Sequence, residues 1–165
     1  MAVQIYNSLT KKKEELIPLH PPTVKMYTCG VTVYDQCHIG HARSLYVFDV
    51  IRRYLQFRGL KVEFVRNITD VDDKIIQKAI ELKKTSQEVS QEQIRLYYED
   101  MNALGISKAN IEPKATDDIP EMVAHIQGLI DKGFAYAVGG AASPAGRDVY
   151  FNVRKFGDYG KLSIN

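Results

Sequence analysis

The sequence predicts an α/β fold that contains parallel strands. An apolar stretch at residues 24–29 has the length of a buried strand, and apolar residues then recur at helical spacing over about residues 38–57. Gly59 is placed to end that helix in a left-handed conformation, and a second apolar stretch follows at residues 61–66. A strand, a helix and a strand at this spacing form a crossover unit, in which the strands are parallel and the connection is right-handed in nearly all known proteins.

The next part of the chain is predicted to be helical. Asp70 can cap a helix over about residues 71–84. Thr85 and Glu88 have the spacing of a capping box, which predicts the start of another helix that Gly105 closes.

The pattern changes towards the end of the sequence. We expect a loop at residues 111–113, and then a helix from about residue 118 to Gly133. Residues 134–138 and 148–153 alternate as strands do, with a glycine-rich loop at residues 139–146 between them. Only two parallel strands are expected before residue 134, which is too few for a complete doubly wound sheet.

Composition excludes several classes of protein. The 165 residues are 45% hydrophobic and 25% charged, which is typical of an ordinary globular domain. The net charge of +2 does not by itself indicate a nucleic-acid-binding protein, although an RNA partner is possible if basic residues are grouped. The first residues lack the apolar core typical of a signal peptide, no stretch has the apolar length expected of a membrane span, and two cysteines do not indicate a disulfide framework. We therefore expect a cytoplasmic location, where thiols stay reduced.

Candidate functional residues follow the ends of both predicted strands. In open α/β sheets ligands bind beyond the carboxyl ends of the strands, so residues 29–32 and 67–70 are expected to face one crevice. The helix that begins near His38 directs its free amides and positive dipole end there, which favours phosphate.

Two histidines stand at the start of this helix. His38 and His41 are one helical turn apart and so share a face, and Gly40 between them leaves room for a flat group such as adenine. The alternative is that both are capping or surface residues. For Cys29 the residues leave open a metal-ligand role or the commoner role of a small buried side chain, and packing is expected for Cys37.

These segments resemble a known family. Residues 38–41 read HIGH, the signature of class I aminoacyl-tRNA synthetases, and residues 26–35 and 65–76 resemble the N-terminal region of cysteinyl-tRNA synthetases. The resemblance runs in register from residue 5 to residue 163. It implies the first half of a Rossmann-type nucleotide-binding fold at residues 1–133 and the beginning of an inserted connective β/α region at residues 134–165.

The resemblance implies ATP-dependent activation of L-cysteine, with Mg²⁺, followed by transfer to the 3′ end of tRNA(Cys). His38 and His41 are the implied catalytic residues, because they stabilise charge on the phosphates. The implied contacts to ATP come from Gly30, Val31, Thr32, His38, Gly40 and His41. The implied contacts to the amino acid come from Cys29, Thr32 and Thr69.

Cys29 is also the implied ligand of a zinc ion in the amino-acid pocket. Zinc that acts on a substrate keeps an open coordination position, which a substrate thiol fills better than a serine hydroxyl. In the family, three further zinc ligands and the KMSKS loop lie beyond residue 165. We therefore expect this stretch alone to have negligible activity and weak zinc affinity. We also expect the full-length enzyme to be monomeric. A local zinc site of Cys29, Cys37, His38 and His41 is not favoured, because it would consume the histidines that ATP needs.

Three alternative functions differ in how well the sequence supports them. A cysteine ligase of the mycothiol type shares the adenylation chemistry, and a non-catalytic nucleotide-binding module is a second alternative. A dinucleotide-dependent dehydrogenase lacks support, because no G-x-G-x-x-G turn follows the first strand. The segment at residues 139–147 is longer than the connection that the family normally has there.

Overall fold

The computed structural model describes residues 2–139 and 147–163, so the expected glycine-rich loop lies mostly outside the described residues. The chain divides into two compact units, residues 17–118 and residues 1–16 with 119–165. The division reflects which residues pack together. It does not test the functional boundary expected near residue 134, which stays a prediction. Within the described residues no helix is long and apolar enough to cross a membrane.

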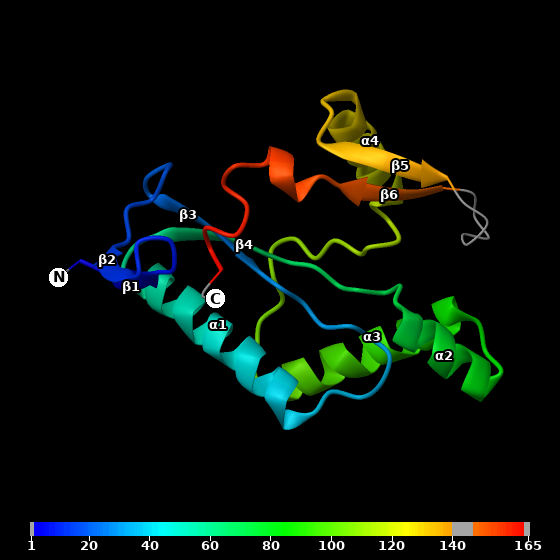
Figure 1. Ribbon diagram of the computed structural model, residues 1–165. Helices are drawn as coiled ribbons and strands as arrows, with labels where there is room; N and C mark the ends of the chain where they lie inside the picture. Colours follow the sequence, from blue (N-terminus) through cyan, green and yellow to red (C-terminus); the bar gives the residue numbers. More distant parts are fainter. Residues whose placement is uncertain (1, 140–146, 164–165) are drawn as a thin grey trace. The chain divides into compact units, whose positions relative to one another are not determined.

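The unit of residues 17–118 contains the predicted crossover (Figure 1). Strand β3 (Thr23–Thr28) pairs in parallel with β4 (Lys61–Arg66), and helix α1 (Ile39–Phe57) connects them. Gly59 ends the helix with φ +81°, as expected. The expectation of parallel strands joined through a helix is confirmed.

A third segment, the loop expected at residues 111–113, lies parallel to the end of β4. The amide of Arg66 donates to Ile111 O at 3.1 Å, and that of Ile68 donates to Pro113 O at 2.8 Å. Ile111 and Lys114 form isolated parallel bridges to Val65 and Ile68, so the predicted loop is present and runs beside the end of β4 without forming a strand. Pro113 is compatible with this position because it contributes a carbonyl and no N–H group is required of it.

The chain between β4 and this segment forms two helices, α2 (Asp73–Leu82) and α3 (Ser86–Ala103). The capping box of α3 is present as predicted: Glu88 N donates to Thr85 Oγ1 at 3.1 Å, and Thr85 N donates to Glu88 Oε2 at 2.8 Å.

The predicted cap of α2 is wrong, because Asp72 caps the helix instead of Asp70. The Asp70 carboxylate instead accepts hydrogen bonds from the amide of Thr116 at 3.0 Å and from its hydroxyl at 2.5 Å. Because Asp70 is bound to Thr116, which is distant in the sequence, Asp72 caps the helix.

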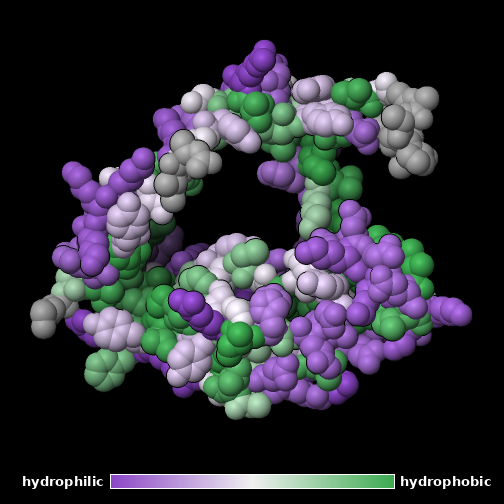
Figure 2. Space-filling model, turned by 60° about the horizontal axis from the view of Figure 1, so that its bottom comes forward, coloured by the Kyte–Doolittle hydropathy of each residue, from purple (hydrophilic) through white to green (hydrophobic). Residues whose placement is uncertain are grey.

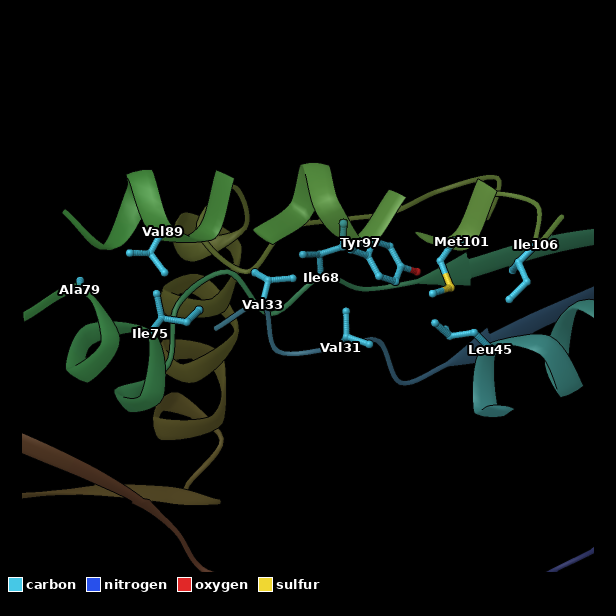
Figure 3. Close-up of a cluster of buried hydrophobic side chains, with 10 residues drawn as sticks. All are labelled: Val31, Val33, Leu45, Ile68, Ile75, Ala79, Val89, Tyr97, Met101 and Ile106. Atoms are coloured by element: carbon cyan, nitrogen blue, oxygen red, sulfur yellow. The ribbon is translucent and has the colours of Figure 1, made fainter. Parts of the chain in front are cut away.

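The core of this unit reaches the ends of the strands (Figure 3). Val31, Val33 and Ile68 lie in the loops that follow β3 and β4, and each is at most 8% exposed. They pack in one cluster with Leu45, Ile75, Ala79, Val89, Tyr97, Met101 and Ile106. The loops that carry the candidate site are thus anchored in the core.

Helix α1 buries only one side. Its buried residues are Leu45, Asp49 and Leu55, whereas Ile39 and Phe57 at its two ends are 84% and 85% exposed. In the view of Figure 2 apolar residues likewise reach the surface among polar ones.

The other unit contains a hairpin that was not predicted, formed by β1 (Gln4–Asn7) and β2 (Lys12–Glu15). Its strands are short and mostly polar, so they give almost no apolar signal. The same unit contains α4 (Ile119–Asp131) and the antiparallel pair of β5 (Ala135–Gly139) and β6 (Arg147–Phe151), close to the expected positions. A 3-10 turn, Val153–Lys155, follows.

Candidate functional site

The loops after β3 and β4 are in direct contact, as expected for two loops that face the same crevice. Gly30 N donates to Asn67 Oδ1 at 3.0 Å. A Cβ atom added at Gly30 would lie 1.5 Å from Asn67 O, which no packing can accommodate. Position 30 therefore requires glycine because of this close backbone approach.

The parallel pairing continues beyond the two strands. Thr69 N donates to Val31 O at 3.1 Å, Val33 N donates to Thr69 O at 3.2 Å, and Thr32 is paired with Thr69. Thr32 and Thr69 are half-buried, whereas the side chain of Val31 lies in the core. Any contact from Val31 to a ligand must therefore come from its backbone.

His38 and His41 come together at the start of α1. Their rings are stacked with centroids 3.9 Å apart and an interplanar angle of 23°, so the expectation that they share a face agrees with the structure. His38 is also the N-cap of the helix, since its Nδ1 accepts a hydrogen bond from Gly40 N at 3.0 Å. A Cβ atom at Gly40 would meet the His38 ring at 2.8 Å, so this ring occupies the position beside Gly40 that was expected to leave room for a flat ligand.

The environment of His41 favours the neutral imidazole. Burial lowers the pKa of His41, and the neighbouring His38 lowers it further. His41 Nδ1 is buried without a hydrogen-bond partner within the described part of the chain. A buried polar atom of this kind is uncommon in folded proteins and fits a position where a ligand supplies the partner.

The two cysteines have different surroundings. Cys29 is exposed just after β3, so the alternative of a small buried side chain does not hold. Cys37 packs against the core, and burial raises the pKa of its thiol, with a further contribution from Asp100. In residues 2–139 and 147–163 no three His, Cys, Asp or Glu side chains come together as metal ligands. Cys29 therefore belongs to no such group in these residues, and one cysteine by itself does not form a tetrahedral zinc site.

The sequence analysis expected Asn67 at the crevice but assigned it no role, and it did not consider Tyr27. Tyr27 Oη donates to Asn67 Oδ1 at 2.9 Å, and Asn67 Nδ2 donates to Thr69 Oγ1 at 3.3 Å. The position of Asn67 directly after β4 was the available signal, because side chains at strand ends line ligand sites in α/β sheets.

A parallel sheet with a HIGH-containing helix at its carboxyl edge is the arrangement of a class I aminoacyl-tRNA synthetase nucleotide-binding domain. Residues 15–165 match the model of the family described as tRNA synthetases class I (C) catalytic domain. The chain belongs to this family.

Relatives named cysteine--tRNA ligase extend this result. Those of Syntrophobacter fumaroxidans and Aquifex aeolicus are 53% and 51% identical over 163 residues, which is 99% of this chain. That of Nitratidesulfovibrio vulgaris strain DP4 is 56% identical over 161 residues, or 98% of the chain. The chain spans 32% of the length of each of these relatives.

The fold is also similar to that of a solved structure, Mycobacterium tuberculosis methionyl-tRNA synthetase in complex with methionyl-adenylate. The TM-score is 0.65 with 14% sequence identity, over 81% of this chain and 33% of that one. At this level of identity the similarity supports the fold alone.

Proposed function

We propose that this chain carries the HIGH-motif half of the active site of a cysteine--tRNA ligase. The observation that carries the proposal is identity of 51–56% to ligases of that name along nearly the whole chain, together with the contact between the strand-end loops and the stacked histidine pair. The reaction has two steps. A carboxylate oxygen of L-cysteine attacks the α-phosphorus of ATP and pyrophosphate leaves, and then a ribose hydroxyl of the terminal adenosine of tRNA(Cys) attacks the acyl carbon and AMP leaves.

His38 and His41 are the proposed catalytic residues. They lie at the positive end of α1, where an anion is stabilised. Because the pKa of His41 is lowered, its ring is neutral at pH 7 and can donate an N–H to phosphate oxygen. The proposed contribution is stabilisation of charge that develops on the phosphates, without proton transfer.

The loops after β3 and β4 are the proposed support for the adenylate and the amino acid. Gly30, Val31 through its backbone, Thr32 and Gly40 would contact ATP, whose phosphates Mg²⁺ accompanies. Cys29, Thr32 and Thr69 would lie on the amino-acid side, since all three follow strand ends. Cys29 would contribute one thiolate to a zinc ion, and further ligands would have to come from outside residues 2–139 and 147–163.

The remaining assignments are also proposals. Residues 1–133 would form half of the nucleotide-binding domain, and residues 134–165 the beginning of the connective insertion. The whole enzyme would be a cytoplasmic monomer that binds tRNA(Cys).

The test uses the complete polypeptide that the gene encodes. We expect cysteine-dependent exchange between ATP and pyrophosphate, and charging of tRNA(Cys) by [³⁵S]cysteine. The 165-residue chain alone should show negligible exchange. Transfer to glucosaminyl-inositol in place of tRNA would favour the mycothiol-type ligase, and ATP binding without exchange would favour the non-catalytic module.

Replacement of either histidine tests the assignment of the pair. His38→Gln and His41→Gln should each lower the exchange rate by about 10²-fold or more, which is typical for the loss of a group that stabilises a developing charge. His125→Gln is the matched control, because His125 lies on the exposed side of α4. Exchange at the unmodified rate in both histidine variants would contradict the assignment.

A further inference from the structure

The side chain of Asn67 connects three groups at the ends of β3 and β4. Its Oδ1 accepts from Tyr27 Oη at 2.9 Å and from Gly30 N at 3.0 Å, and its Nδ2 donates to Thr69 Oγ1 at 3.3 Å. We propose that Asn67 is a positioning residue that orients the Thr69 hydroxyl towards bound cysteine. This inference rests on the proposed function, which places Thr69 beside the amino acid.

The orientation of the Asn67 amide is determined by its partners. A backbone N–H can only donate, so the atom that faces Gly30 N must be the amide oxygen. The amide nitrogen then faces Thr69, and Thr69 Oγ1 must accept from it. One lone pair of the hydroxyl is thereby occupied, and its O–H together with the second lone pair remains for a ligand.

Asn67 and Thr69 lie on the side of the chain that the core leaves accessible. Along β4 and beyond, alternate residues are buried, and these include Arg66 and Ile68. Asn67 and Thr69 alternate with them, so both side chains project from the other face of the sheet, and both are half-buried. Backbone pairing with residues 31 and 33 holds Thr69 itself in place. What remains to be fixed is the direction of its hydroxyl, and Asn67 is the group that fixes it.

A double-mutant cycle separates this role from a structural one. Asn67→Asp keeps the oxygen acceptor for Gly30 but cannot donate to Thr69, so the hydroxyl must turn its proton towards the carboxylate. In the complete enzyme we expect kcat/KM for cysteine to fall about 10- to 100-fold, the scale at which a misdirected substrate contact acts. The KM for ATP should stay unchanged, since the bond from Gly30 is retained.

The second half of the cycle uses Thr69→Ala. In that background Asn67→Asp should change kcat/KM for cysteine less than about threefold, because the group through which Asn67 acts is gone. An effect of the added charge alone would persist in both backgrounds. Asn102→Asp, at an exposed position of α3, adds the same charge elsewhere and should behave as the unmodified enzyme.

Additive effects in the cycle, or unmodified cysteine kinetics in Asn67→Asp, would overturn the inference. If Asn67→Asp does not fold, the cycle is repeated with Asn67→Ala, where the lost bond to Gly30 contributes equally in both backgrounds. An unmodified enzyme without cysteine-dependent exchange would overturn the proposed function itself, and this outcome is distinct from an additive cycle.

Discussion

Replacement of Gly30 by alanine should destabilise the ends of β3 and β4. The added Cβ would lie 1.5 Å from Asn67 O, whereas real contacts are not found below 3.0 Å, so the two backbones must separate by at least the difference of 1.5 Å. That shift disrupts the bond from Gly30 N to Asn67 and the two backbone bonds between Thr69 and residues 31 and 33. At roughly 1 kcal/mol for each bond the loss is about 3 kcal/mol. Alanine returns about 0.5–1 kcal/mol by restricting the unfolded chain.

The expected net effect is therefore about 2–2.5 kcal/mol, which corresponds to roughly a 30- to 70-fold increase in local opening. Because the chain has two units, native-state hydrogen exchange of β3 and β4 is a better assay than a single unfolding midpoint. Gly128→Ala is the matched control: nothing lies within 4 Å of its added Cβ in α4, so that helix should become more stable by about 0.5–1 kcal/mol. Unchanged protection of β3 and β4 in Gly30→Ala would refute the reasoning.

Three further perturbations address other parts of residues 17–118. Thr85→Ala removes the capping box of α3 and should cost about 1 kcal/mol, measured by native-state hydrogen exchange of α3; a loss below about 0.3 kcal/mol would contradict it. Asp49→Ala removes a buried carboxylate that accepts from Arg53 Nε at 2.7 Å, and hydrogen exchange of α1 should show a loss of about 1.5–3 kcal/mol, with no change counting against it. Because the pKa of His41 is lowered on folding, its contribution to stability is complete above the unfolded value of about 6.5 and is lost as the pH falls through the folded value. An NMR titration should show this low pKa, with a partial rise in His38→Gln; a His41 that titrates at the ordinary value would contradict it.

The sequence was sufficient where a local pattern and the fold agree. The strand–helix–strand unit was predicted almost to the residue, because apolar periodicity and Gly59 mark its elements. The sequence was not sufficient to predict a residue's role where that role depends on a partner far away in the chain. Asp70 and Asp72 are equally good caps in isolation, and only the contact of Asp70 with Thr116 assigns the cap to Asp72.

The same distinction holds for the site. The stacked histidines follow from helical spacing, which is local. The role of Asn67 depends on three partners, two of them 37 and 40 residues away, and no spacing in the sequence reveals it. The pairing of residues 111–113 was missed for the same reason, since its hydrogen bonds are made to residues far earlier in the chain.

The loops of the site contribute residues to the core, so a substitution in the core can also change the site. Val31 and Ile68 are buried, yet each is adjacent in the chain to a proposed ligand-contacting residue or to Asn67. A conservative change such as Ile68→Val opens a small void and lets the flanking backbone settle by a fraction of an ångström. That displacement would be passed directly to Asn67 and Thr69. Variants of this kind should therefore lose more activity than their loss of about 0.5–1.5 kcal/mol in stability explains, and a screen based on thermal stability alone would underestimate their effect.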